Sequence, residues 1–173
     1  MARCAAHDPR AIIGAMPDMS DNSRDALVVD AFERLGVPLT RQRRRVWEYF
    51  STCARASTIA EAAAAVGSDG VGQATVYRTV ALLNEMGLLV RVQTSHPEAC
   101  YTAIGVGHTH PLVCHRCRKV VQFDGEGDLS VLERHLEATT GFSVYGHHLE
   151  VYGVCPACVA QAGTSVAGEA GEP

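Results

Sequence analysis

Two pairs of cysteines carry the strongest chemical signal in the sequence. Cys114 is paired with Cys117 and Cys155 with Cys158, each in the spacing Cys-x-x-Cys. Two thiolates three residues apart on a turn can reach one metal ion, and two such turns complete a tetrahedron. An all-thiolate site leaves no position for water, so its role is to stabilise the fold. We therefore predict that these four cysteines hold a structural Zn²⁺ ion, the alternative being unrelated buried thiols.

Histidines form a second candidate site, because seven of the eight lie in the rear half of the chain. His108 and His110 point to the same side if their segment is extended, since side chains alternate along a strand. A third histidine, His147 or His148, would complete a nitrogen-rich site for Zn²⁺, Ni²⁺ or Fe²⁺. Three carboxylates on the intervening loop are candidate oxygen ligands: Asp124, Glu126 and Asp128. The alternative is a solvated linker with scattered histidines.

The front half of the chain has the pattern of four helices and a hairpin. The helices are expected at about 22–35, 40–53, 58–67 and 73–86, and the strands at 88–93 and 100–103. Thr58 and Glu61 have the spacing of a capping box, and Gly36 and Gly87 are natural helix stops. This order predicts a winged helix-turn-helix, with the fourth helix in the major groove of DNA and the hairpin as the wing.

The rear half predicts a small α+β module built around the cysteines. A strand at 112–123 is interrupted by the first cysteine pair, a helix runs from Leu129 to near Gly141, and 142–154 forms two short strands or one bent strand. The predicted fold class is α+β. Its parts are a winged-helix domain at 22–104, a metal-binding domain at 105–160, and disordered tails at 1–21 and 161–173.

Composition and charge narrow the function classes. The 173-residue chain is 47% hydrophobic, which excludes wholesale disorder. Its net charge of −4 hides an asymmetry, because residues 23–91 carry nine arginines against seven carboxylates while the rear half is acidic. A basic front half indicates a nucleic-acid partner. The sequence has no signal peptide and no apolar run of about 18 residues, so we expect a cytoplasmic protein without a membrane partner.

The predicted fourth helix carries side chains that can read DNA. Thr75 and Arg78 share one helical face and Tyr77 lies beside them. Tyr and Thr side chains can contact a thymine methyl, and Arg can reach a guanine or a phosphate. Four arginines of the second helix could neutralise phosphates: Arg41, Arg43, Arg44 and Arg45. The alternative is an amphipathic helix pair with a solvated arginine face.

Four motifs resemble one known family, in the family's order. They are LTRQR at 39–43, ATVYRTV at 74–80 with LL and GL after it, HTHPLVCHRC at 108–117 with KVVQF, and YGVCPAC at 152–158. Together they resemble the ferric uptake regulator family over about residues 24–160. The resemblance implies a homodimeric, metal-dependent transcriptional regulator, usually a repressor, in which the winged helix binds AT-rich palindromic DNA and the rear domain dimerises.

The resemblance also implies residue roles. The four cysteines match the structural zinc ligands, and Tyr77 and Arg78 match a DNA-reading pair, with Arg43 on a phosphate. His108, His110 and His147 match three ligands of a regulatory site, whose divalent metal (Zn²⁺, Fe²⁺, Mn²⁺ or Ni²⁺) is left open.

Two departures from the family pattern bear on the signal. The family's glutamate ligand to the regulatory site falls at or next to Ser130, so Glu126 or Asp128 would have to substitute. A second family site at the hinge falls on four residues that are poor ligands: Ala56, Thr102, Thr109 and Pro111. His96 and Cys100 at the wing are the candidates for rebuilding it.

We therefore expect a metal-responsive regulator of metal uptake or homeostasis genes and not an enzyme. A peroxide- or redox-sensing regulator of the same family is the first alternative, although the missing hinge ligands count against it. A zinc hydrolase is the second, against which stands the lack of a His-Glu-x-x-His motif. A zinc-stapled adaptor that does not touch DNA is the third.

Overall fold

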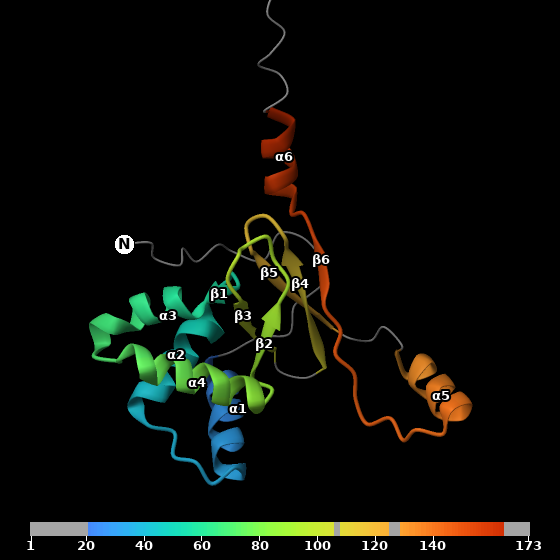
Figure 1. The fold of residues 1–173 in the computed structure, drawn as a ribbon, viewed down its shortest axis with the longest axis horizontal. Coiled ribbons are helices and arrows are strands. Elements are labelled where there is room, and N and C mark those ends of the chain that lie inside the picture. The colour runs from blue at the N-terminus through green and yellow to red at the C-terminus, as the bar shows by residue number, and fades with distance from the viewer. Residues whose placement is uncertain (1–20, 106–107, 125–128, 165–173) are drawn as a thin grey trace, which may run out of the picture.

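The computed structural model describes residues 21–105, 108–124 and 129–164 (Figure 1). Its elements are α1 (Asp21–Arg34), α2 (Arg41–Thr52), β1 (Ser57–Thr58), α3 (Ile59–Val66), η1 (Gly67–Asp69), α4 (Gln73–Glu85), β2 (Leu89–Val92), β3 (Cys100–Ala103), β4 (Thr109–Cys114), β5 (Val120–Asp124), α5 (Leu129–Thr140), β6 (Val151–Gly153) and α6 (Pro156–Thr164). The predicted α+β class is confirmed, with a helical front half and an α+β rear half. Among the described helices, none is both long and apolar enough to cross a bilayer.

The front half packs its helices around one apolar core. Trp47 and Phe50 from α2 are buried against Val76 and Leu83 from α4, at spacings that the helical periodicity predicted. Two of the helix starts expected from the sequence, at residues 40 and 58, are capped as the sequence predicts. The Thr40 side chain accepts a hydrogen bond from the backbone N–H three residues on, and the capping box at the start of α3 is complete. These bonds satisfy N–H groups that have no partner inside the first turn of a helix.

The wing is a small antiparallel sheet in the order β1-β3-β2. β2 and β3 pair from Leu89 with Ala103 to Val92 with Cys100, as the predicted hairpin requires. β1 adds a third strand that the sequence analysis did not predict, pairing Ser57 with Tyr101. A strand of two residues is too short to show an alternating pattern, so it could not be predicted from periodicity.

The rear half is built on a sheet in the order β5-β4-β6. β4 pairs antiparallel with β5, and its last three residues pair parallel with β6. β4 begins at Thr109, three residues earlier than expected, and includes Pro111. Proline has no N–H to donate to a neighbouring strand, so it is rare in a strand that is paired on both sides. β6 pairs only with Leu112 and later residues of β4, so at Pro111 β4 is still an edge strand.

Two expectations for the rear half are wrong. Residues 142–154 were expected to form two short strands or one bent strand, but only Val151–Gly153 is a strand and residues 142–150 run as irregular chain between α5 and β6. The C-terminal tail was expected to be disordered from residue 161, but α6 continues to Thr164. The remainder of both predicted tails lies outside the described residues.

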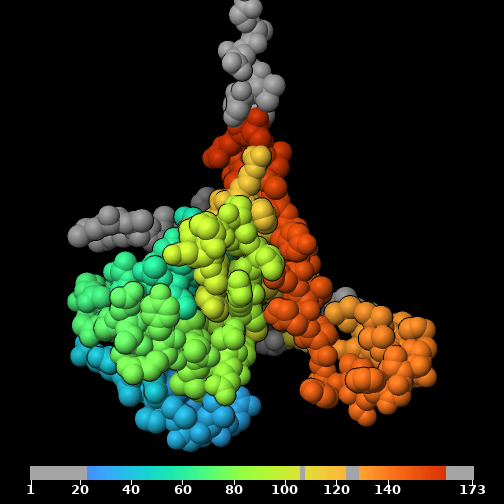
Figure 2. All heavy atoms as spheres, viewed as in Figure 1, coloured from blue at the N-terminus to red at the C-terminus, as the bar shows by residue number. Residues whose placement is uncertain are grey.

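α5 and α6 stand away from the body of the protein (Figures 1 and 2). None of the described side chains of α5 is buried, although its leucines follow the apolar periodicity that predicted the helix. Large apolar side chains are exposed on α5 and the segment after it: Val131, Leu132, Leu136, Phe142 and Tyr145. Tyr152 of β6 and Val159 of α6 are exposed as well. A helix that exposes its apolar side is typical of a surface that another chain covers.

The turn that carries the first cysteine pair joins the two halves of the protein. Arg118, in this turn, makes a two-pronged contact with Glu61 of α3, with N···O distances of 2.7 and 2.8 Å. Arg55 donates from Nε to the Cys117 carbonyl, and the Ala56 N–H donates to the Arg118 carbonyl at 2.8 Å. The winged helix is therefore held to the cysteine turn by main-chain and charged hydrogen bonds.

Candidate functional site

The four predicted zinc cysteines come together at one end of the rear sheet. Cys114 ends β4, Cys117 lies in the turn after it, Cys155 follows β6, and Cys158 lies in α6. The Sγ atoms of Cys114 and Cys158 are 3.9 Å apart and those of Cys117 and Cys155 are 3.6 Å apart, with all four within 4.8 Å of one another. A Zn–S bond of about 2.3 Å places the sulfurs of a tetrahedral site about 3.8 Å apart. The cluster therefore fits a Zn²⁺ ion, which would fix α6 to the sheet.

The electrostatics of the cluster also call for a cation. Burial raises the pKa of the Cys114 thiol, but backbone N–H groups of Cys117, Cys155 and Arg116 outweigh this and bring it to about 6. The neighbouring thiol of Cys155 raises the pKa of Cys158 to about 12, and burial raises that of Cys117. Four thiolates cannot ionise together this close unless a positive charge sits between them. The thiols are free in the structure.

The three predicted histidines converge at the other end of β4. His108 and His110 flank the start of the strand, and His147 reaches them from the segment before β6. The Nε2 atom of His110 lies 3.1 Å from Nε2 of His108 and 3.4 Å from Nε2 of His147. A metal–nitrogen bond of about 2.0–2.1 Å would place tetrahedral ligand nitrogens about 3.3–3.4 Å apart. The arrangement therefore fits one divalent metal ion with three imidazole ligands.

His110 is the buried member of this cluster, with 7% of its surface exposed. Burial, together with the neighbouring His108 and His147, lowers its pKa below the ordinary 6.5. The lowered pKa favours the neutral imidazole, which is the form that binds metal. The cleft over the cluster is also lined by residues of the segment between α5 and β6, among them Val144 and Tyr145.

The structure brings a carboxylate to the histidines that the sequence analysis did not single out. Glu133, on α5, lies with Oε1 2.7 Å from Nδ1 of His147. The candidate oxygen ligands Glu126 and Asp128 lie outside the described residues. Asp124 ends β5, opposite Thr109. The sequence could not point to Glu133, because its contact is with His147. That residue lies in a segment without regular structure, whose path cannot be predicted from periodicity.

The proposed replacement for the hinge site is not formed among the described residues. Cys100 is 1% exposed and lies 3.8 Å from an Arg118 nitrogen, and His96 belongs to no cluster of metal-ligating side chains in that part of the chain. The wing is instead tied to the rear domain by hydrogen bonds, with Ser95 donating to the His115 carbonyl at 2.7 Å. A salt bridge and main-chain contacts thus occupy the junction between the halves.

α4 presents the residues predicted to read DNA. Tyr77 is 48% exposed and Arg78 is exposed, whereas Val76 and Val80 of the same helix are buried. Thr75 is half-buried, and its carbonyl accepts a hydrogen bond from Thr79. Tyr77 and Arg78 are therefore free to reach a groove, with Thr75 at its margin.

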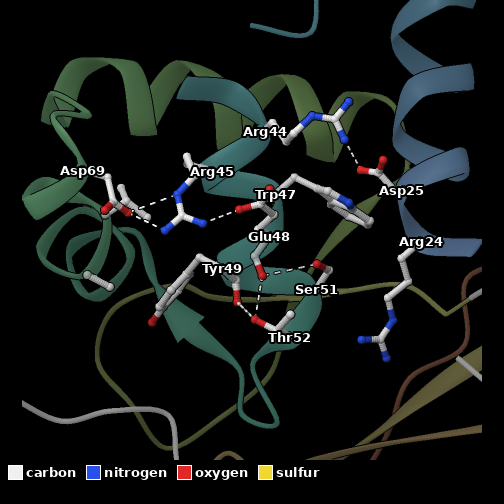
Figure 3. Close-up of a pocket in the computed structure, with 12 residues that line it drawn as sticks. Arg24, Asp25, Arg44, Arg45, Trp47, Glu48, Tyr49, Ser51, Thr52 and Asp69 are labelled. Atoms are coloured by element: carbon white, nitrogen blue, oxygen red, sulfur yellow. Dashed lines mark hydrogen bonds and ion pairs between the residues drawn. The ribbon is translucent and has the colours of Figure 1, made fainter. Parts of the chain in front are cut away.

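The arginines of α2 are less available than the sequence suggested (Figure 3). Arg44 pairs with Asp25 of α1, and Arg45 contacts both Asp69 and Glu48. These two guanidinium groups are neutralised within the protein, so they are poor phosphate ligands in this arrangement. The Arg43 guanidinium donates to the Pro38 carbonyl, and its Cζ atom lies over the Phe32 ring, 5.8 Å from the ring centre.

Comparison with known proteins decides the family. The model of the ferric uptake regulator family matches residues 34–152, which is more than half of the chain. The chain belongs to the ferric uptake regulator family. Proteins of this family are metal-binding, DNA-binding transcription regulators and not enzymes, so the hydrolase and adaptor alternatives are wrong.

Individual members of the ferric uptake regulator family show how far the likeness extends. The peroxide operon regulator of Bacillus subtilis (strain 168) is 29% identical over 132 residues, covering 75% of this chain and 90% of that protein. A solved structure described as holo XcZur is 26% identical with a TM-score of 0.58, covering 80% of this chain and 99% of its own. A zinc uptake regulator complexed with zinc and DNA has the same fold, at 22% identity and a TM-score of 0.59, covering 83% and 99%.

Proposed function

We propose that this protein is a homodimeric repressor whose affinity for DNA is set by a divalent metal at His108, His110 and His147. The observation that carries the proposal is the convergence of the three Nε2 atoms, two of them 3.1 and 3.4 Å from the buried His110. The cysteine cluster would hold a second, structural Zn²⁺ ion that stays bound when the histidine site empties. The metal of the histidine site is Zn²⁺, Fe²⁺, Mn²⁺ or Ni²⁺. Imidazole ligands favour Zn²⁺, Ni²⁺ and Fe²⁺ over Mn²⁺.

The DNA partner is an AT-rich palindromic operator read by two copies of α4. The exposed Tyr77 and Arg78 support base contacts, and Thr75 and Arg43 support contacts at the edge of the groove and to a phosphate. A palindrome requires a twofold dimer, and the exposed apolar face of α5 supports a second copy as its cover. The solved zinc uptake regulator bound to zinc and DNA supports the same use of the fold.

Metal and DNA binding are coupled through the placement of the rear domain. Metal at the histidines would tie the segment before β6 to the start of β4, close to where the chain leaves the winged helix. Linkage requires that DNA tighten metal binding by the same factor by which metal tightens DNA binding. Allosteric coupling is typically about 5–150-fold, which requires about 1–3 kcal/mol of differential binding.

The test removes the histidine site and leaves the cysteine site. Metal per chain would be measured before and after mild chelation, and operator affinity would be measured by fluorescence anisotropy with and without each candidate metal. The double change His108→Ala with His110→Ala should abolish the exchangeable metal and the metal-dependent gain in DNA affinity, while one resistant zinc remains. His135→Ala, on the exposed side of α5, is the matched control. If the double variant retains metal-dependent DNA binding, the proposal is wrong.

A second candidate signal is peroxide, and the names of the relatives favour it over metal supply. The Bacillus subtilis relative is a peroxide operon regulator, and the Staphylococcus aureus (strain USA300) relative, 26% identical, is a peroxide-responsive repressor. With Fe²⁺ loaded, one oxygen atom of hydrogen peroxide would be added to a ligand imidazole and the other would leave as water. Mass spectrometry of the peptides that contain His110 and His147 decides the signal. One added oxygen, with loss of DNA binding, supports peroxide sensing, and an unmodified peptide supports metal sensing.

A further inference from the structure

The two ring nitrogens of His147 face different partners. Nε2 points to the cluster, 3.4 Å from Nε2 of His110, while Nδ1 lies 2.7 Å from Oε1 of Glu133. The contact is partly shielded from water, because the side chains of His147 and Glu133 are 20% and 30% exposed. Glu133 itself does not belong to the group of donor atoms that lie within 4.8 Å of one another.

This geometry fixes the tautomer of His147. An ionised carboxylate can only accept hydrogen bonds, so the proton of the neutral imidazole must be on Nδ1. The lone pair of Nε2 is then directed at His108 and His110, where a metal ion would sit. A carboxylate behind a metal-binding histidine both orients the ring and increases its basicity.

We infer that Glu133 is the positioning residue of the histidine site and that, among the residues the structure describes, the donor set is all nitrogen. The inference rests on the proposed function, since it concerns the same three histidines. An all-imidazole set favours Zn²⁺ or Ni²⁺ over Mn²⁺, which prefers carboxylate and water oxygen. Glu133 therefore affects metal selectivity in two ways. It orients His147, and its own oxygens are not among the metal ligands.

The next carboxylate on the same helix provides a matched control. Glu137 lies one turn further along α5 and accepts a hydrogen bond from the Val144 N–H at 2.9 Å. It holds the same segment to the same helix but does not touch the histidines. A change at Glu137 thus tests attachment of the segment alone, and a change at Glu133 tests attachment together with the His147 hydrogen bond.

The experiment compares Glu133→Gln, Glu133→Ala and Glu137→Ala in the full chain with its cysteine site loaded. Zn²⁺ and Mn²⁺ affinities of the second site would be measured by chelator competition, and the His147 tautomer by long-range ¹⁵N spectra of the metal-free histidine site. Glu133→Ala should weaken Zn²⁺ binding by about 10–100-fold and produce a mixture of His147 tautomers. Glu133→Gln, whose amide oxygen can still accept from Nδ1, should restore the tautomer and most of the affinity, and Glu137→Ala should leave the tautomer unchanged.

Three results would count against the inference, and the first of them separates it from the proposed function. If Glu133→Ala keeps both the tautomer and the Zn²⁺ affinity while His110→Ala loses the second metal, Glu133 has no positioning role and the proposed function stands. If the unaltered protein takes up no second metal, the proposed function and the inference fail together. A site that binds Mn²⁺ as tightly as Zn²⁺ contradicts the all-nitrogen donor set.

Discussion

The ion pair between Arg118 and Glu61 offers a quantitative test of how the two halves are joined. Hydrogen bonding to Arg118 lowers the pKa of Glu61 from 4.5 to about 2, against the opposing effect of burial and with help from the Thr58 N–H. If the whole shift were expressed as stability, it would amount to about 3.4 kcal/mol. The Glu61 side chain is 40% exposed, so screening by water reduces this, and we expect about 1–2 kcal/mol.

The perturbation is Glu61→Gln, which removes the charge but leaves an oxygen that can still accept from the Thr58 N–H. Urea unfolding of the zinc-loaded protein at neutral pH should show a loss of about 1–2 kcal/mol relative to the unaltered chain. Glu98→Gln, an exposed carboxylate on the wing, is the control and should change little. Arg118→Gly removes the guanidinium at a position where φ is +64°, which suits glycine, so it completes a double-mutant cycle without adding backbone strain.

The pH dependence gives the same test an internal check of sign. Because the folded-state pKa of Glu61 is depressed, its stabilisation is fully present above about pH 4.5 and is lost as the pH falls toward about 2. Glutamine does not titrate, so the difference in the free energy of unfolding between the unaltered chain and Glu61→Gln should become smaller as the pH falls over that range. A difference that stays constant with pH, or a coupling energy near zero in the cycle, would refute the reasoning.

Two further predictions concern the metal and DNA faces. Cys117→Ser should remove one sulfur ligand and lower the zinc content; because the ion would hold α6 to the sheet, it should also lower the midpoint of thermal unfolding. An unchanged zinc-to-protein ratio would contradict the tetrathiolate assignment. Arg78→Ala should weaken operator binding by about 10–100-fold, whereas Arg45→Ala should have little effect because its guanidinium is already paired with Asp69 and Glu48; equal losses in anisotropy titrations would show that the internal pairs do not hold on DNA.

Local signals in the sequence predicted the front half well. Caps and stops such as Thr40, Thr58 and Gly87 act within one or two turns, so their effect can be read without knowing the rest of the fold. The helix α5 could be predicted for the same reason, from the spacing of its leucines. Its lack of packing could not, since a period shows which side is apolar and not what covers it.

Contacts between distant segments account for what the sequence did not reveal. The Cys-x-x-Cys spacings predicted their site because each pair carries half of the geometry locally. The Glu133–His147 and Glu61–Arg118 contacts join residues 14 and 57 positions apart, with no motif to connect them. Likewise, the pairing of Arg44 and Arg45 with acidic partners turned an apparent phosphate-binding row into a set of internal ion pairs.

One short strand connects the two proposed metal sites. β4 carries His110 near its start and Cys114 at its end, four residues apart, a span of about 13 Å at the rise of a strand. The cysteine end is fixed to the winged helix through the turn that contains Arg118, while the histidine end meets the segment that Glu133 ties to α5. A change at the histidines can therefore move α5 relative to a strand already fixed to the DNA-binding half. On the proposed function, we therefore expect the cysteine site to stay in place and occupancy of the histidine site to alter the spacing of the two winged helices in a dimer.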